Sequence, residues 1–349
     1  MKTTIQMVAK KAGVSTSTVS RVLNNHPAVL PETRTKVLSV MKELDYIPNQ
    51  LARGLSSNGF NNILIIFTRS STHACNNPYF GNIISSIGMI AEQNDYDLIL
   101  HSSEDEDNEI EKSLSMINSK LIKGIVLLSS RINSRFLDIL SGTGIPMVVI
   151  GRYDSTIVSR RILSVDTDNY NDSRKIGEHL IQKGHTHIGC IHAPLLHYVA
   201  LDRVRGLKDS LSSHGIPVRE DCFVNGGDTV ESAYMAALNL ICSNRNITAI
   251  FATDDIKALG VYKAAKNMEL RIPEDISVIG YNDFDFAPLL TPALTTVHVP
   301  IHELGMVSAS KLFSMIKNNT AENSQMLPTQ LLLRDSVAEI YTTKALKEI

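Results

Sequence analysis

The chain has 349 residues, of which 43% are hydrophobic and 20% are charged, so its length and balance fit two or three globular domains. The net charge of the chain is −2. Residues 1–60 carry eight basic and three acidic side chains, so their net charge is +5 and that of the remaining residues is −7. A polyanionic partner that binds residues 1–60 alone would explain this asymmetry. Four separated cysteines argue against a zinc or redox motif, and the short apolar runs and missing signal segment predict a cytoplasmic protein without membrane contact.

The N-terminal segment has the pattern of three short helices. Residues 4–11 place apolar side chains on one helical face, and Gly13 can end that helix in the left-handed conformation. Ser15 stands where an N-cap belongs, ahead of a second helix predicted over residues 16–23. A third helix is predicted to begin at Pro31, which suits a first helical position. Two helices joined by a tight turn that contains glycine form a helix-turn-helix.

Hydroxyl side chains crowd the start of the second predicted helix. Serine and threonine are poor interior helix formers, so their use here needs a reason. In a helix-turn-helix this end of the second helix meets base edges and phosphates, and Arg21 follows on an exposed face, where it can reach a guanine edge or a phosphate. The alternative is that the hydroxyl groups only solvate the helix.

The stretches VAKKAGVSTSTVSRVLNN and TRTKVLSVMKELDYIPNQLARGLSS resemble the DNA-binding headpiece of the LacI/GalR family of bacterial repressors, and the likeness extends over essentially the entire chain. Leu30 departs from the Ser or Thr that usually caps the third helix in that family. The resemblance implies a hinge helix that folds only on operator DNA, with Leu55 wedged between base pairs of the minor groove. A plain flexible linker is the alternative. The predicted DNA-binding residues are Thr4, Ser15, Thr16, Ser17, Thr18, Ser20, Arg21, Asn24, Asn49, Ala52 and Leu55.

Beyond residue 61, short apolar strands alternate with helical stretches of 10–15 residues. This rhythm predicts parallel, doubly wound sheets with helices on both faces, and its two successive series predict two α/β lobes. The fold class is therefore an all-α helix-turn-helix headpiece followed by an α/β core of two doubly wound lobes, which by resemblance is periplasmic-binding-protein-like. The predicted boundaries are 1–45 for the headpiece, 46–60 for the hinge and 61–349 for the core, with a first lobe of about 61–162 and 291–321 and a second of about 163–290 and 322–345.

Ligands of such folds bind in the crevice beyond the carboxyl ends of the strands. Tyr79 and Phe80 follow the first core strand and offer a flat apolar wall for the C–H face of a sugar. Arg203 lies in an Arg-x-x-Gly motif that the family shares and can grip a ligand oxygen through two N–H groups. The predicted effector-binding residues are Tyr79, Phe80, Arg152, Arg203, Asp254 and Asn282.

The chemical class of the effector follows less directly from the sequence than the fold does. The segments NPYF, DR at residues 202–203 and GR at residues 151–152 resemble the maltose-operon regulators of the family, which implies a malto-oligosaccharide or other glucoside. Galactosides, ribose and nucleosides remain open, as does the choice between inducer and corepressor. The resemblance implies a homodimer, because residues 291–305 lead into an interface helix and no leucine heptads follow.

Other classes of function fit the sequence less well. A nucleophile elbow, a P-loop and a GxGxxG in the right context are all missing, so we expect neither an enzyme nor a cofactor. A sugar receptor with the same core would not explain the basic headpiece. The histidine cluster at residues 179–192 and the acidic run at residues 102–112 are read as a helix-to-strand junction and a helix start, with a metal site as the alternative to each.

Overall fold

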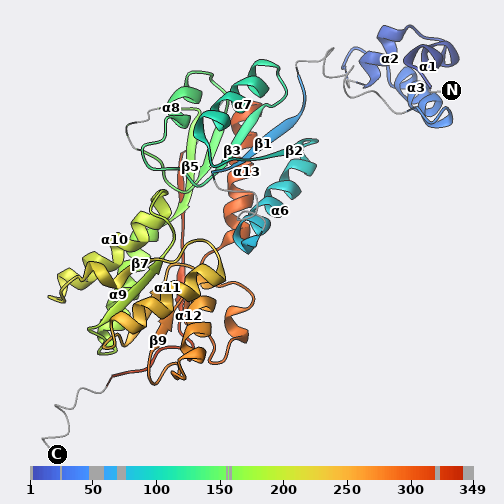
Figure 1. The fold of residues 1–349 in the computed structure, drawn as a ribbon. Helices are drawn as coiled ribbons and strands as arrows, with labels where there is room; N and C mark the ends of the chain where they lie inside the picture. Colours follow the sequence, from blue (N-terminus) through green and yellow to red (C-terminus); the bar gives the residue numbers. More distant parts are fainter. Residues whose placement is uncertain are drawn as a thin grey trace, which may run out of the picture. The chain divides into compact units, whose positions relative to one another are not determined.

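The structure is a computed structural model that describes residues 3–23, 26–46, 59–68, 76–154, 156, 159–318 and 323–340. The chain divides into two units, Met1–Asn61 with Asn118–Ile122, and the remainder, which are treated separately below (Figure 1). Four of the predicted DNA-binding residues, Asn24, Asn49, Ala52 and Leu55, lie outside the described residues, as does most of the predicted hinge.

The headpiece confirms the three predicted helices. The described residues form α1 (Ile5–Ala12), α2 (Thr16–Leu23) and α3 (Pro31–Glu43). Gly13 ends α1 at a φ of 68°, a left-handed conformation in which glycine carries no Cβ penalty. Leu30 precedes α3 without a side-chain hydrogen bond to the helix, so this helix begins on Pro31 alone, as expected. The helices pack around a small core of buried side chains: Val8, Ala9, Ala12, Val19, Val22, Val37, Val40 and Met41.

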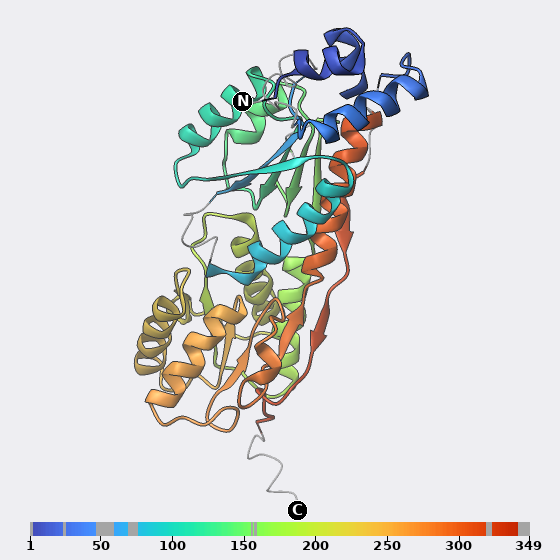
Figure 2. The ribbon, with the colours of Figure 1, turned by 90° about the vertical axis from the view of Figure 1, so that its right-hand side faces the viewer.

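The first lobe of the core is built on a parallel sheet. Within the described residues its strand order is β11-β5-β4-β3-β1-β2. The strands are β1 (Asn62–Phe67), β2 (Asp97–Ser102), β3 (Gly124–Leu128), β4 (Met147–Ile150), β5 (Ile162–Thr167) and β11 (Gln325–Leu327). The helices are α6 (Pro78–Gln93), α7 (Glu106–Asn118), α8 (Phe136–Ser141) and α13 (Ile301–Asn318). Figures 1 and 2 show α6 beside α13, which covers β3, β4 and β5 from one face.

The second lobe repeats this plan with a smaller sheet. Its strand order in the described residues is β7-β6-β8-β9, again all parallel. The strands are β6 (Ile188–His192), β7 (Phe223–Asn225), β8 (Ala249–Ala252) and β9 (Ser277–Ile279). The helices are α9 (Asn169–Gln182), α10 (Tyr198–Ser213), α11 (Val230–Ser243) and α12 (Asp255–Asn267), with 3-10 turns at Glu220–Cys222 and Ala287–Leu289. Helix α9 packs on α10, and α11 packs on α12.

One glycine fixes how α10 meets α9. A Cβ at Gly206 would stand 2.2 Å from the carbonyl oxygen of Tyr170, so the two backbones approach too closely for any other residue. The glycine of the Arg-x-x-Gly motif therefore sets the position of the arginine one turn before it, Arg203. Because this contact is between backbones, it could not be read from the periodicity of either helix.

The lobe boundaries differ from the prediction by a few residues. β5 pairs with β4, and β11 pairs with β5, so residues 162–167 and 325–327 belong to the sheet of the first lobe. The prediction assigned nearly all of these residues to the second lobe. It is wrong there, because the parallel ladder of the first sheet continues to Thr167 before the chain crosses to the second lobe. The remaining crossings are made by β10 (Thr296–His298) and β12 (Gln330–Leu332), which pair antiparallel.

Candidate effector cavity and nucleic-acid interface

A cavity lies between the two lobes, at the carboxyl ends of their strands. The space between its walls is about 750 Å³ when the open solvent at its mouth is counted. The lining residues include five of the six predicted effector contacts, and they come from both lobes. The lining residues are Asn77, Tyr79, Phe80, Ser129, Ile150, Gly151, Asp166, Thr167, Asn169, Ala193, Val199, Ala200, Arg203, Asp228, Thr253, Asp254, Asn282 and Val299.

Two aromatic rings at the start of α6 supply an apolar wall. Asn77 caps this helix by accepting a hydrogen bond from the Tyr79 N–H at 3.0 Å, which fixes the first turn beside the cavity. The rings of Tyr79 and Phe80 meet edge to face with centroids 5.5 Å apart, and Phe80 packs in the same way on Phe67. This wall can stack on the C–H face of a sugar ring.

Arg203 is held in place by three neighbours. Its Nε donates to the Asn169 side-chain oxygen at 2.8 Å, and its Nη1 donates to the Thr253 carbonyl at 2.5 Å. The guanidinium lies over the ring of Tyr281 at 3.5 Å, and the whole residue is buried. These contacts fix the plane of the guanidinium at the cavity wall, which is the arrangement that directed recognition of a ligand oxygen requires.

Asp254 and Asn282 follow neighbouring strands and form an acceptor-rich part of the wall. Burial alone would raise the pKa of Asp254, but the Lys257 ammonium and its hydrogen bonds outweigh burial and hold that pKa below its ordinary value. Asn282 is buried at a φ of 109°, and among the described residues no group donates to its side-chain oxygen. A buried oxygen without a donor is costly, so this position favours a ligand that supplies one.

Arg152 does not line the cavity, although the neighbouring Gly151 does. Its Nε and Nη2 donate to the two carboxylate oxygens of Asp202 at 2.5 and 2.6 Å, and its guanidinium lies 4.1 Å from the centre of the Tyr198 ring. The prediction that Arg152 reaches the cleft is therefore not met in this structure, because the carboxylate of the opposite lobe binds the guanidinium. The pair instead connects the two lobes beside the cavity.

Sequence reasoning missed several polar groups of the cavity, namely Asn77, Ser129, Asp166, Asn169, Asp228 and Thr253. Asp166 is the next-to-last residue of β5, and Asn169 begins α9 two residues after the strand ends. The rule that ligands bind at strand carboxyl ends applies to this SVDTDN segment as it does to the segments that were chosen. Applying it to every strand would have found both residues.

Burial raises the pKa of Asp166 to about 7, against the hydrogen bond from the Thr167 N–H and the nearby Arg203 guanidinium. Because the folded state then binds this proton more tightly than the unfolded chain, its contribution to stability is complete below about pH 4 and is lost as the pH rises through about 7. For wild type, the free energy of unfolding should therefore fall between about pH 5 and 8. We expect Asp166→Asn to reduce this fall by at least about 1 kcal/mol. Urea unfolding without sugar measures this, with the exposed Asp97→Asn as the control. Parallel profiles for wild type and Asp166→Asn would contradict the assignment.

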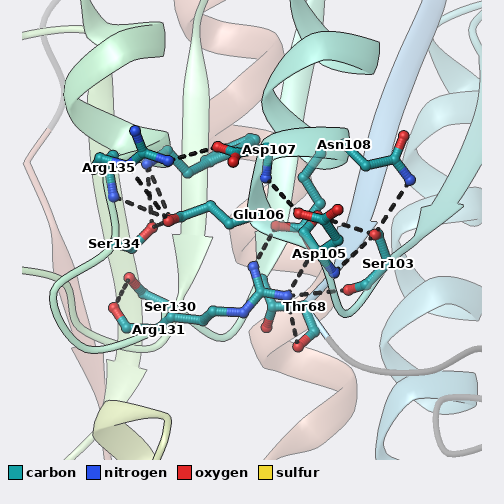
Figure 3. A network of polar contacts seen from close by, with 12 residues as sticks. Thr68, Ser103, Asp105, Glu106, Asp107, Asn108, Ser130, Arg131, Ser134 and Arg135 are labelled. Atoms are coloured by element: carbon teal, nitrogen blue, oxygen red, sulfur yellow. Dashed lines mark hydrogen bonds and ion pairs between the residues drawn. The ribbon is translucent and has the colours of Figure 1, made fainter.

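A charged network joins the segment after β3 to the neighbouring elements of the first lobe (Figure 3). The Arg131 guanidinium donates to both oxygens of the buried Glu109, at 2.5 and 3.0 Å, and to the carbonyls of Thr68 and Ser103. It thereby connects the ends of β1 and β2 to α7. Figure 3 also shows the Ser134 hydroxyl, in the segment after β3, donating to the Glu106 carboxylate at the start of α7. The network fixes the segment after β3.

That segment docks onto the second lobe. The Ile132 N–H donates to the Leu196 carbonyl at 3.0 Å, and the Tyr198 N–H donates to the Ser130 carbonyl at 3.3 Å. The buried His197 forms a hydrogen bond of 2.9 Å with the Thr68 hydroxyl. Together with the Arg152–Asp202 ion pair, these hydrogen bonds join the first lobe to the start of α10 in the second lobe, close to Arg203.

In the headpiece, the start of α2 presents its hydroxyl groups outward. Ser15, Thr16, Ser17 and Arg21 are exposed, whereas Thr18 and Ser20 are half-buried. Thr4 is also exposed, and its hydroxyl accepts the Met7 N–H at the start of α1. Val19 and Val22 face the core, so the helix separates an apolar face from a polar one. An exposed face of hydroxyl groups and one arginine suits contacts with phosphates and base edges.

Ser15 is the N-cap of α2. Its hydroxyl accepts the Thr18 N–H at 3.1 Å and lies within 2.9 Å of the Ser17 and Thr18 hydroxyls. We expect Ser15→Ala to destabilise the headpiece by about 1 kcal/mol, which raises amide exchange rates of α2 roughly fivefold in the full chain. Ser39→Ala, in the exposed middle of α3, is the control and should change exchange little. Unchanged exchange in Ser15→Ala would show that the cap contributes nothing.

The part of the chain that the structure describes contains neither a cluster of metal ligands nor a helix that could span a membrane. In the ranges that the structure describes, no three His, Cys, Asp or Glu side chains gather as metal ligands would. His185 forms hydrogen bonds with the Thr248 hydroxyl and the Ala338 carbonyl, which accounts for both ring nitrogens. None of the described helices is both long enough and apolar enough to cross a bilayer.

Comparison with known proteins places this geometry in a family. The sequence model of bacterial regulatory proteins of the lacI family matches residues 4–49, and that of a periplasmic binding protein-like domain matches residues 178–337. The repressor PurR of Proteus mirabilis is 34% identical over 96% of this chain and 97% of its own, and the probable repressor ExuR of Bacillus subtilis is 32% identical over 97% and 99%.

Among solved structures, a complex of the transcriptional regulator CelR with cellobiose has a TM-score of 0.72 and 27% identity, covering 96% of this chain and 99% of CelR. Both PurR and ExuR, the two relatives above 30% identity described here, are named as transcriptional repressors. The fold agrees with the predicted headpiece and two-lobed core. The chain belongs to the LacI family and is a DNA-binding transcriptional repressor.

Proposed function

We propose that a neutral, hydroxyl-rich sugar binds in the interlobe cavity and regulates operator binding by the headpiece. The observation that carries this proposal is the composition of the wall, which combines the aromatic rings of Tyr79 and Phe80 with hydrogen-bond acceptors that include the Asn282 oxygen, for which the described residues supply no donor. A sugar offers both an apolar ring face and several hydroxyl donors.

The charges of the cavity favour a neutral ligand. Arg203 is the cation of the lining, and it is accompanied by the carboxyl groups of Asp166, Asp228 and Asp254. An anionic ligand such as a uronate would meet these carboxyl groups, whereas hydroxyl groups would donate to them. CelR, a relative at 27% identity, is known in complex with cellobiose, a disaccharide, which supports the same class.

The resemblance to maltose-operon regulators has no support from the relatives described above, whose names are PurR, ExuR and CelR. Maltose therefore remains one probe among several. We expect a thermal-shift panel of cellobiose, maltose, glucose, galactose, ribose, glucuronate and adenosine to single out one or more neutral sugars, because a ligand of the native state raises its melting temperature. A response to glucuronate or adenosine alone would overturn the proposal.

The regulatory step is a shift between two arrangements of the lobes. A homodimer would place two headpieces on a pseudo-palindromic site, with Thr4, Asn24 and the start of α2 at the DNA and with Asn49, Ala52 and Leu55 in the hinge. A sugar that binds one lobe arrangement better moves the population toward it and changes operator affinity. A repressor must reach chromosomal DNA, so we place this protein in the cytoplasm. Gel shifts with a selected operator, with and without the sugar, test the coupling, and sedimentation tests the dimer.

A further inference from the structure

A buried lysine lies directly behind the acceptor wall of the cavity. Lys257 is in the first turn of α12, and its side chain is only 2% exposed. Its Nζ lies 2.7 Å from Oδ2 of Asp254, and its backbone N–H donates to Oδ1 of the same carboxylate at 2.9 Å. Asp254 lines the cavity, whereas Lys257 does not. The two residues thus form an ion pair that faces the ligand space only through its anion.

Packing does not explain this lysine. The buried residues of α12 that follow Lys257 are all small or apolar, namely Ala258, Gly260, Val261, Ala264 and Ala265. Replacing a buried ion pair with apolar residues is often neutral or stabilising, so such a pair is weak evidence for a role in stability. Its position one helical turn from a cavity residue points to a role in the cavity.

The ion pair determines what charge the wall presents. Without Lys257, a buried carboxylate at the cavity surface would attract any cation that can enter, because opposite charges interact strongly away from water. With Lys257, both oxygens of Asp254 remain acceptors, but the charge is balanced within the protein. The Arg203 guanidinium also acts on Asp254, but it is already bonded to Asn169 and Thr253.

We propose that Lys257 is a positioning and specificity-determining residue, which holds Asp254 as a charge-balanced acceptor and makes the cavity select neutral hydroxyl-bearing sugars over cationic amino sugars. This inference rests on the proposed sugar-binding function and adds the discrimination to it. Lys257 does not touch the sugar; it acts through the Asp254 carboxylate. A merely structural lysine would affect both kinds of sugar equally.

The test compares Lys257→Met with wild type in the full chain by calorimetric titration. The neutral probes are glucose, cellobiose and maltose, and the cationic probe is glucosamine at about pH 6, where its amine is protonated. We expect Lys257→Met to shift the ratio of glucosamine affinity to neutral-sugar affinity about tenfold toward glucosamine, which corresponds to about 1.4 kcal/mol. Lys263→Met is the matched control, because Lys263 is an exposed lysine of the same helix that pairs with Glu231.

A second variant separates charge from packing. In Lys257→Met with Asp254→Asn both charges of this ion pair are removed while the other charged groups of the wall stay, so we expect the wild-type preference for the neutral sugar to return. Should the single variant fail to fold, this double variant decides alone: a ratio of glucosamine affinity to neutral-sugar affinity within about threefold of wild type supports the inference, and a larger shift toward glucosamine overturns it.

The outcomes distinguish this inference from the function on which it rests. If wild type binds a neutral sugar and Lys257→Met leaves the affinity ratio unchanged, the role of Lys257 is wrong and the sugar site stands. If wild type binds glucosamine more tightly than every neutral probe, the inference is also wrong. If wild type binds none of these sugars, the proposed function fails and this inference fails with it.

Discussion

Arg203→Ala is expected to remove the response of operator binding to sugar. The guanidinium is buried and bonded to Asn169 and Thr253, so its remaining N–H groups are held in one orientation at the cavity wall. Truncating one partner of a buried, hydrogen-bonded charge costs about 2–5 kcal/mol, which corresponds to an affinity loss of about 30-fold to several thousandfold. Titration with the sugar found in the panel measures the loss, and a gel shift with and without that sugar measures the response.

The helix that carries Arg203 offers its own control. Arg205 lies two residues further along α10, is exposed and is not part of the cavity lining, so Arg205→Ala should bind the sugar as wild type does. Arg203→Lys keeps the positive charge but loses the planar fork, and we expect it to recover little of the affinity. A normal sugar response in Arg203→Ala would remove this residue from the effector site.

The sequence predicted the headpiece well because its structure is set by local rules. The bounds of α2 and the start of α3 agree with the prediction, and α1 lies one residue further along the chain than predicted. Gly13 and Ser15 act on the backbone within three residues of themselves, so their effects are visible in a short stretch of sequence. The alternation of strands and helices in the core is likewise a repeating local pattern, and it predicted both sheets.

The parts that were missed depend on partners far away in the sequence. Arg152 looks like a cleft residue at the end of β4, but its partner Asp202 is on a helix of the other lobe. The strand-end rule could have located Asp166, but its raised pKa and the ion pair of Lys257 with Asp254 depend on burial, which the sequence does not reveal. The crossing after β5 depends on a strand ladder and not on a change in composition. Such features follow from tertiary contacts alone.

Arg21→Ala is expected to weaken binding to the selected operator by about 1–3 kcal/mol, or roughly 5- to 150-fold. Arg21 is exposed on α2 in the turn after the hydroxyl groups, and Val19 and Val22 bury the other side of the helix. Binding of operator variants at several salt concentrations measures the effect. Lys42→Ala, at the exposed end of α3, removes the same charge from another helix and controls for the general loss of attraction to DNA.

The pattern of the loss shows what Arg21 contacts. If the side chain reads a base edge, Arg21→Ala relaxes the preference for one base pair and leaves the salt dependence almost unchanged. If it binds a phosphate, all sequences weaken together and the slope of log affinity against log salt falls by about one. Either pattern places the exposed face of α2 at the DNA, as the hydroxyl groups at its start and the apolar face opposite them predict. An operator affinity equal to that of wild type would mean that this face of the headpiece does not meet the operator.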